Sequence, residues 1–255
     1  MPTEAEIAEA LRENAELREK LEQSLGAQKA AQAAADRAVK ELQDFVYATS
    51  HDLQEPLRTL SAYAQLLQRK YAEDAEASEL TGFIVHGAKQ VTSLVQALLA
   101  YSRAGNSPRR STVKLEVIIQ SALYKLQEQI RASGAKVVCG ELPEMLVDQT
   151  QLTQVLEQLI GNAIAYRSAE PPLIEIGAEE GEDGYKVSVR DNGKGIEPRF
   201  HEQIFLPFKR LHGKEVAGAG LGLAVCRKII AAHSGTIWVE SDGAHGSAFQ
   251  FTIPF

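Results

Sequence analysis

The chain has 255 residues, enough for two modest domains and a further segment. Hydrophobic residues make up 44% and charged residues 24%, as in an ordinary soluble protein. Basic residues number 27 and acidic residues 34, which gives a net charge of −7. Because phosphate backbones are bound by an excess of Lys and Arg, we do not expect nucleic acid as a partner.

Two further features limit the class of protein. No apolar run is long enough to span a bilayer and no signal peptide opens the chain, so we expect a cytoplasmic protein with no direct membrane span. The two cysteines, Cys139 and Cys226, lie far apart in apolar surroundings and lack the spacing of metal ligands. We expect both to be buried free thiols.

Residues 1–40 have the composition of a long helix. Ala, Glu, Lys, Gln and Leu dominate, with no glycine except Gly26 and no proline after Pro2. Apolar residues, continuing past residue 40, follow an alternating three-and-four spacing: Ile7, Leu11, Leu21, Leu25, Ala35, Val39, Leu42 and Val46. The seam positions between them are polar, namely Asn14, Arg18, Gln28 and Gln32. A solvated helix is the alternative, but continuity with the next segment favours a coiled-coil signalling stalk.

Residues 41–104 predict two amphipathic helices joined by the polar stretch AEDAEAS. The first apolar stripe contains Leu57, Leu60, Ala64, Leu67 and Tyr71. The second contains Leu80, Ile84, Gly87, Val91, Leu94, Leu98 and Tyr101. An antiparallel hairpin cannot cover both of its apolar faces alone, so we expect a homodimer in which two hairpins form a four-helix bundle.

Residues 105–110 read as a linker, because Gly, Asn, Ser and Pro together interrupt regular structure. Residues 111–255 mix strands with helices. The predicted strands are VKLEV, KVVC, LIEIGAE, YKVSVRD, TIWVES and FQFTI, and the predicted helices cover roughly 116–133, 149–167 and 219–234. This order predicts an α/β sandwich with one face of the sheet covered by helices, so the whole chain is multidomain, α and α+β.

His51 is the first candidate for chemistry. It lies two residues after the seam position Thr49 and two before Leu53, which is about 200° of helix turn, so we expect it to project away from the core stripe. Pro56 removes a backbone hydrogen bond and crowds the carbonyl of Asp52, at a cost of about 3 kcal/mol. A deformable helix beside a residue that accepts a phosphoryl group would explain this proline. A casually exposed histidine is the alternative.

The neighbours of His51 suit phosphoryl transfer. A neutral imidazole nitrogen is a competent nucleophile near pH 7. Asp52 could take a proton or hydrogen-bond the other ring nitrogen. Glu55 and Arg58 follow one and two turns later on the same face, where ordinary surface charge is the alternative for both.

Separate pieces of residues 111–255 predict a nucleotide pocket. Asn162 and Gln158 share one face of a predicted helix, and an Asn amide oxygen suits Mg²⁺. Asp191, at a strand end, can accept a hydrogen bond from an exocyclic amine such as that of adenine. Gly193 and Gly195 would let the backbone approach a flat ring, although a tight turn is the alternative.

A second glycine-rich stretch precedes the last helix. Gly218, Gly220 and Gly222 would present backbone N–H groups and the positive end of the helix dipole to phosphates. The segment between Gly195 and Gly218 is long and charged, as a mobile lid would be.

In this order the pieces closely resemble the sensor histidine kinase family over roughly residues 40–255. SHDLQEPLR is similar to its H box, the helix around Asn162 to its N box, and DNGKGI to its G1 box. IFLPFKRL resembles the F box and GAGLGLA the G2 box. The resemblance implies a phosphoacceptor hairpin followed by a Bergerat-type ATP-binding domain, which also occurs in Hsp90, gyrase and MutL proteins without that hairpin.

The resemblance also implies roles and cofactors. ATP and Mg²⁺ are expected, with His51 as phosphoacceptor, Asp52 as general base and Asn162 as the Mg²⁺ ligand. Asp191 would anchor adenine, Phe205 and Phe208 would dock the lid, and the rest of the pocket would come from Gln158, Tyr166, Gly193, Gly195, Ile196, Gly218, Gly220, Leu221 and Gly222.

Three positions depart from the family pattern. Gln158 replaces an Asn, and Ala165 replaces a Lys that is expected near the phosphates, with Arg167 or Lys209 as candidate substitutes. Glu55 stands where many members have the Thr or Asn that orients water to hydrolyse a phosphorylated partner, which puts phosphatase activity in doubt.

The sequence therefore predicts ATP-dependent autophosphorylation of His51 and transfer to an Asp of a response-regulator receiver domain. An upstream sensor module would act through the stalk as a small rotation or register shift. The alternatives are a catalytically weak signalling scaffold and a Bergerat ATPase without a phosphoenzyme.

Overall fold

The computed structural model describes residues 4–211 and 219–255, and some side chains of the first helix, including that of His51, lie outside the described set. By its internal contacts the chain divides into two units, Met1–Thr49 and Ser50–Phe255. Over the described ranges, no helix combines the length and the apolar character needed to cross a bilayer.

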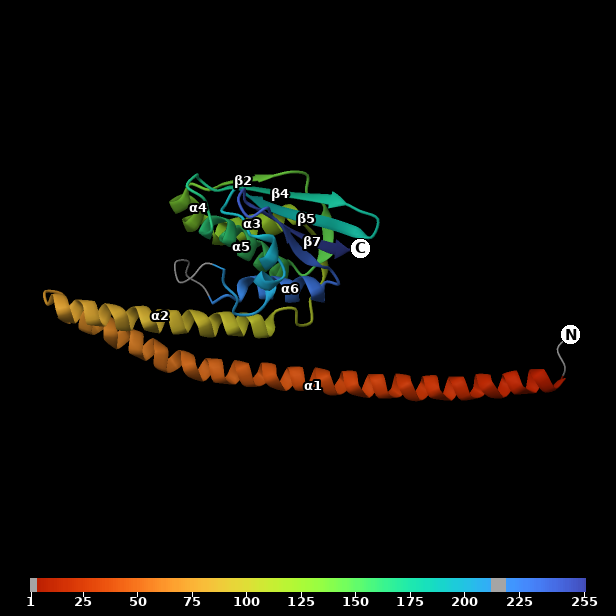
Figure 1. Ribbon diagram of the computed structural model, residues 1–255. Coiled ribbons are helices and arrows are strands. Elements are labelled where there is room, and N and C mark those ends of the chain that lie inside the picture. The colour runs from red at the N-terminus through yellow and green to blue at the C-terminus, as the bar shows by residue number, and fades with distance from the viewer. Residues whose placement is uncertain (1–3, 212–218) are drawn as a thin grey trace. The chain divides into compact units, whose positions relative to one another are not determined.

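The first helix, α1, spans Glu4–Lys70 (Figure 1). It continues through Pro56, so the proline does not end it. Of the predicted coiled-coil seam, Leu21 is 60% exposed and Leu25 is 46% exposed, as single-chain seam residues would be. The side chains of Ile7, Leu11, Ala35, Val39 and Leu42 lie outside the described residues, so the coiled coil stays a prediction.

The predicted helical hairpin is confirmed. The second helix, α2, spans Ala75–Arg103 and begins at Asp74, whose Oδ1 accepts the N–H groups of Glu76 and Ala77, both at 3.1 Å. A carboxylate here satisfies free N–H groups and complements the positive end of the helix dipole. The buried positions of the hairpin include small and medium-sized residues: Ala64, Thr81, Val85, Ala88 and Val95.

The larger apolar residues of the hairpin point outward. Leu60 is 52% exposed, Leu67 45% and Leu94 43%, and further exposed members of the predicted stripes are Tyr71, Leu80, Ile84 and Val91. Leu53, one turn before the first stripe, is also exposed. The two helices of one chain therefore use the smaller residues against each other and leave a long apolar face uncovered, as expected of a hairpin without its pair.

The second domain contains a five-stranded mixed sheet in the order β2-β4-β5-β7-β6. These strands are β2 Lys136–Cys139, β4 Leu173–Glu180, β5 Gly184–Asp191, β7 Ser247–Pro254 and β6 Ile237–Glu240. In this sheet β2 and β4 pair in parallel, and the other three neighbouring pairs are antiparallel. A separate two-stranded ribbon pairs β1, Ser111–Lys114, with β3, Glu144–Val147.

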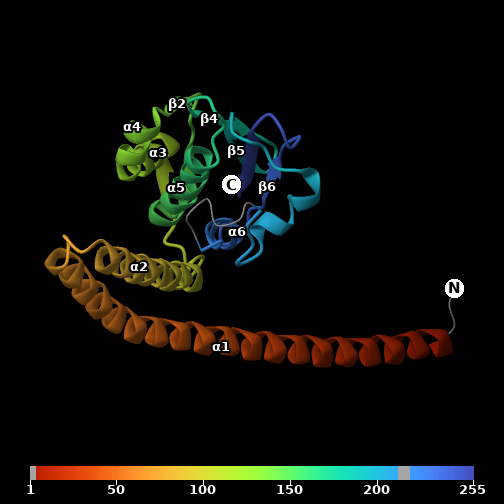
Figure 2. The same ribbon diagram turned by 60° about the vertical axis from the view of Figure 1, so that its left-hand side comes forward.

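Helices cover one face of the sheet, as Figures 1 and 2 show, so the predicted sandwich is confirmed. They are α3 Leu115–Lys125, α4 Gln127–Ser133, α5 Gln149–Ala165 and α6 Gly222–Ala232, with short 3₁₀ turns at Pro198–Phe200 and Gln203–Phe205. Two local predictions are wrong. The VKLEV strand ends at Lys114, where α3 begins, and the predicted 116–133 helix is interrupted at Leu126, whose ψ of 5° lies outside the α-helical range.

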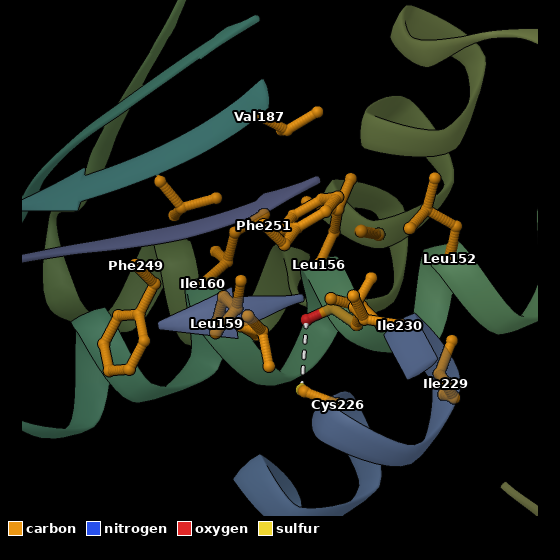
Figure 3. Packing of buried hydrophobic residues seen from close by; sticks show 14 of the residues in the cluster. Leu152, Leu156, Leu159, Ile160, Val187, Cys226, Ile229, Ile230, Phe249 and Phe251 are labelled. Carbon is orange, nitrogen blue, oxygen red and sulfur yellow. Dashed lines mark hydrogen bonds between the residues drawn. The ribbon is translucent and has the colours of Figure 1, made fainter. Parts of the chain in front are cut away.

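Side chains of α5 and α6 meet the inner face of the sheet in a continuous apolar core (Figure 3). Leu156 and Ile160 of α5 and Phe251 of β7 are fully buried. Cys226 of α6 is also buried, and its Sγ lies 3.9 Å from the carbonyl oxygen of Val155. Burial raises the pKa of Cys226 to about 12, so this thiol is unreactive at neutral pH. The expectation of two buried thiols is wrong for Cys139, which is exposed on the edge strand β2.

Candidate nucleotide-binding site

Helix α5 carries the first part of the site. Asp148 begins the helix by accepting the N–H of Gln151 at 3.0 Å, and the buried face then runs through Leu152 and Leu156. Asn162 lies on another face in the last turn, half-buried. The apolar face of α5 fixes the helix on the sheet and directs Asn162 toward the cavities described next.

Two adjoining cavities lie beside the end of α5. The first is lined by five residues that the sequence predicted: Asn162, Tyr166, Asp191, Gly195 and Ile196. The second shares two of these and extends to the start of α6, with lining residues Gln158, Asn162, Tyr166, Gly220, Leu221 and Gly222. The fold thus gathers these residues from three distant sequence segments. Their individual roles stay predictions.

Asp191 ends strand β5 inside the first cavity. Its Oδ1 accepts the N–H of Gly193 at 2.7 Å and that of Ser247 at 3.3 Å. Both bonds go to the same oxygen, Oδ1. Burial raises the pKa of Asp191 and outweighs the two backbone hydrogen bonds, which favour the ionised form.

The glycines after Asp191 are required by the protein's own packing. A Cβ on Gly193 would lie 2.7 Å from the carbonyl oxygen of Tyr166, and one on Gly195 would lie 2.6 Å from the backbone nitrogen of Ala244. Gly195 also has a φ of 75°, in the left-handed region that favours glycine. Gly193 does not line either cavity and instead holds Asp191 through its N–H.

The sequence reasoning missed the β6–β7 loop and the start of β7. Ser247 and Phe249 line the first cavity, and Ser247 pairs with Asp191 across the sheet. Ser241 accepts the N–H of Ile196 at 2.9 Å and donates to the carbonyl of Gly246 at 2.6 Å, so the loop supports the turn after Asp191. No local motif signals these residues, because strand pairing brings them to the site. Other lining residues not predicted for the pocket are Lys194, Ile204, Leu211 and Leu223.

The start of α6 forms the floor of the second cavity. Leu221 precedes the helix without a side-chain cap, and Gly220 has a φ of 69°. The Gln158 side-chain oxygen lies against Gly222, so closely that a Cβ there would collide with it. The longer Gln158 therefore contacts the first turn of α6, where free N–H groups and the positive dipole end are available to anions.

Two cationic side chains line both cavities, in a chain that has Ala165 in place of the expected lysine. They are Lys209 and Arg210, which follow the 3₁₀ turn at Gln203–Phe205. Arg167, the other candidate substitute, donates through Nη1 to the carbonyl of Ile164 at 3.3 Å and is absent from the residues that line these two cavities.

The two phenylalanines of the lid segment differ. Phe205 is buried and meets Phe249 edge-to-face, with ring centroids 6.4 Å apart. Phe208 is 60% exposed and lines neither cavity. Its backbone N–H donates to the carbonyl of Gly220 at 2.9 Å, which connects the lid segment to the glycine-rich stretch before α6. Gly218 lies outside the described residues.

Asn162 is a candidate ligand for a metal ion among the described residues of these cavities. Among the side chains that the structure describes, no three His, Cys, Asp or Glu residues form a metal-binding group. The amide oxygen of Asn162 is a hard ligand at the junction of both cavities, and Mg²⁺ commonly takes one or two protein ligands together with substrate phosphates. The site therefore fits Mg²⁺ that arrives with a nucleotide.

The helix around His51 presents polar side chains. Asp52 is exposed, and Glu55 and Arg58 line a polar groove between α1 and α2 together with Lys89 of α2. Glu55 and Arg58 thus share one face of α1, and whether His51 lies on it stays a prediction. The orientation of the His51 side chain lies outside the described residues.

Comparison with known proteins places two family models on the chain. Residues 41–107 match the His Kinase A (phospho-acceptor) domain. Residues 147–255 match the histidine kinase-, DNA gyrase B- and HSP90-like ATPase domain. The first contains His51 and the second contains every predicted pocket residue.

Individual relatives agree with both models. Cyanobacterial phytochrome A from Nostoc sp. strain PCC 7120 is 44% identical over 223 residues, which are 86% of this chain but 29% of that protein. The chain thus spans less than a third of that phytochrome.

Solved structures of histidine kinases are also similar to this chain. The catalytic domain of histidine kinase ThkA is 33% identical with a TM-score of 0.50, covering 57% of this chain and 97% of that one. ThkA in complex with response regulator protein TrrA is 25% identical with a TM-score of 0.58, covering 83% and 61%. Full-length ShkA in complex with AMPPNP is 25% identical with a TM-score of 0.66, covering 83% and 46%.

The buried carboxylate gives a prediction in which stability and binding move in opposite directions. Asp191→Asn keeps an oxygen acceptor for Gly193 and Ser247 but removes a charge whose burial is unfavourable. At pH 7.5 we expect Tm to rise by about 2 °C and affinity for a fluorescent ATP analogue to fall about tenfold or more.

The stability difference between Asp191→Asn and wild type should depend on pH. Because the folded-state pKa of Asp191 is raised, the stability advantage of Asp191→Asn should be full above that pKa and should shrink as pH falls and Asp191 becomes neutral. The matched control is Asp183→Asn at an exposed carboxylate, which should change neither quantity. Unaltered nucleotide affinity in Asp191→Asn would contradict the assigned role.

Proposed function

This chain belongs to the sensor histidine kinase family, and we propose that it transfers the γ-phosphate of ATP to its own His51. One observation carries the proposal: a phosphoacceptor domain containing His51 and an ATPase domain lie in one chain in that order. The cavity around Asp191 and Asn162 supports the nucleotide side of the reaction.

In the proposed step, one imidazole nitrogen of His51 attacks the γ-phosphorus. The bond from phosphorus to the bridging oxygen breaks and ADP leaves. Asp52, the next residue in the helix, takes the proton from the other ring nitrogen, which leaves a neutral phosphoimidazole. Positioning and charge neutralisation supply most of the rate enhancement in such transfers.

In this proposal different pocket residues contact the adenine and the phosphates of the nucleotide. Asp191 accepts the adenine amino group, and the first turn of α6 offers its N–H groups to the phosphates. Mg²⁺ held by Asn162 would neutralise phosphate charge. Lys209 supplies the cation that Ala165 lacks, and this is supported by its place at both cavities.

The proposed partners follow from the family and the exposed surface. ThkA forms a complex with a response regulator protein, which supports transfer from His51 to an Asp of a receiver domain here. The large apolar residues left exposed on the hairpin support a homodimer. The phytochrome relatives, of which this chain spans less than a third, support an upstream sensor module that acts through α1. Glu55 makes phosphatase activity toward the regulator unexpected.

A catalytically weak signalling scaffold is the second candidate. Ala165 removes the expected lysine, and the side chain of Gln158 lies against Gly222 at the start of α6, where phosphates would bind. An ATPase without a phosphoenzyme is the third candidate, because the ATPase domain also occurs without a phosphoacceptor.

Incubation with Mg²⁺ and γ-labelled ATP separates the three candidates. We expect acid-labile, base-stable label on the wild-type protein and none on His51→Ala, because an alanine has no nucleophilic nitrogen. Nucleotide affinity should be equal for both proteins, which shows that the variant is folded.

The other outcomes are equally informative. ATP hydrolysis without protein label would support the ATPase. Neither label nor hydrolysis, despite nucleotide binding, would support the scaffold. Label that persists in His51→Ala would contradict the assigned phosphoacceptor.

The homodimer gives a second prediction. Leu67 belongs to the exposed apolar stripe, whereas Leu66 lies on a different face although it is as exposed. We expect size-exclusion chromatography with light scattering to show a dimer for wild type and for Leu66→Glu, and a mostly monomeric species for Leu67→Glu. In Leu67→Glu an unpaired carboxylate would be buried at the interface of each subunit, and this would oppose association. A dimer of unchanged strength with Leu67→Glu would contradict this interface.

A further inference from the structure

The last turn of α2 is completed by a residue of the ATP-binding domain. The final four carbonyls of a helix have no partner within it. Three of those in α2 are satisfied locally. The N–H of Ala104 donates to Ala100 at 2.9 Å, and Asn106 donates to Arg103 through its backbone at 3.2 Å and to Ser102 through its side chain at 3.4 Å.

The fourth carbonyl, that of Tyr101, accepts a hydrogen bond from Lys228 of α6. The Nζ–O distance is 2.9 Å, and the same ammonium lies 4.6 Å from the centroid of the Tyr101 ring. A cation at the C-terminal end of a helix also complements the negative end of its dipole. Partial burial lowers the pKa of Lys228, whereas its contacts with the carbonyl and the ring favour the charged ammonium.

The chain after this contact is held closely to α6. Gly105 has a φ of 74°, and a Cβ there would lie 2.7 Å from the carbonyl oxygen of Lys228. Ala104 is 4% exposed and belongs to the domain core. Arg110 donates through Nη2 to the carbonyl of Ala232 at 2.8 Å. The segment from Tyr101 to Arg110 therefore follows the C-terminal half of α6.

The same segment is tied to the start of α5. The N–H of Arg109 donates to Asp148 Oδ2 at 2.8 Å, and Gln151 donates through Nε2 to the carbonyl of Asn106 at 3.1 Å. The N–H of Asp148 donates to Nε2 of the buried His233 at 3.0 Å, which joins this helix start to the end of α6. Both helices that carry cavity residues thus also hold the linker.

Helix α6 connects this contact to the nucleotide site. It begins at Gly222 in the second cavity, and Lys228 lies six residues later, about 9 Å along the helix. A helix of two to three turns, packed on the sheet, moves as a rigid unit. A shift of its first turn is therefore transmitted to the contact with Tyr101.

We propose that Lys228 is a positioning residue for phosphoryl transfer, because its bond to the Tyr101 carbonyl fixes where α2 ends and how the ATP-binding domain is held on the hairpin. The inference rests on the proposed function. Without Lys228 the last turn of α2 would lose a carbonyl partner, the linker would lengthen, and the nucleotide would meet His51 less often. Nucleotide affinity should not change, because Lys228 lines neither cavity.

The experiment compares Lys228→Met, which keeps an apolar stem, with Lys228→Arg, which keeps a cation and its donors. The matched control is Arg227→Met, at an exposed neighbour on the same helix. For Lys228→Met we expect the single-turnover autophosphorylation rate at saturating ATP to fall about tenfold, with ATP affinity unchanged. Lys228→Arg should recover most of the rate, and Arg227→Met should match wild type.

A second readout reports the linker directly. Trypsin can cleave after Arg103, Arg109 and Arg110, and we expect this cleavage to be about tenfold faster in Lys228→Met than in wild type or Lys228→Arg. An unchanged rate of label in Lys228→Met, a parallel loss of ATP affinity, or unchanged cleavage would overturn the role of Lys228. Absence of label on wild type would overturn the proposed function instead, and cleavage would still show whether Lys228 holds the linker.

Discussion

The nucleotide site depends on the packing of α5 and α6 against the inner face of the sheet. Leu156 of α5, Ile229 of α6 and Phe251 of β7 are fully buried in one core, and close-packed interiors resist small displacements. Because the buried faces fix both helices, the end of α5 and the start of α6 present Asn162 and Gly222 to adjoining cavities. The positions of these cavity residues are thus set by apolar contacts outside the cavities.

Helices α5 and α6 each contact both the candidate nucleotide cavities and the linker. The end of α5 and the start of α6 line the candidate nucleotide cavities, whereas the start of α5 and the C-terminal half of α6 hold the linker through Asp148, Lys228 and the carbonyl of Ala232. Buried His233 connects these two linker-holding ends by bonding the N–H of Asp148. The nucleotide site and the attachment to the hairpin are therefore opposite ends of the same rigid elements.

The sequence was sufficient for the fold class and for most of the pocket. Hydrophobic periodicity predicted the hairpin, and glycine and polar residues near helix and strand ends predicted Asn162, Asp191 and Gly220. It could not predict Ser247 and Phe249, because they reach the cavity through the pairing of β7 with β5.

Other features could not be read from local patterns for similar reasons. The short strand β3 has the sequence EMLV, which shows no alternation of apolar and polar residues, and it forms by pairing with β1. Gly193 was assigned to the ligand, but it contacts Tyr166 and holds Asp191, since the role of a glycine depends on which backbone lies beside it. The Lys228 contact joins residues 127 positions apart and leaves no trace in the spacing of either segment.

Transfer of the phosphoryl group from ATP to His51 can be tested at the acceptor residue itself. Trypsin releases residues 41–58 as one peptide, ELQDFVYATSHDLQEPLR, which contains His51 together with Tyr47, Thr49 and Ser50 as competing acceptors. Mass spectrometry at neutral pH, with fragmentation that preserves labile phosphoryl groups, locates the modification after incubation with Mg²⁺ and ATP. We expect one phosphoryl group, on His51. A phosphoryl group on Ser50, Thr49 or Tyr47, or an unmodified peptide while another part of the chain is labelled, would contradict it.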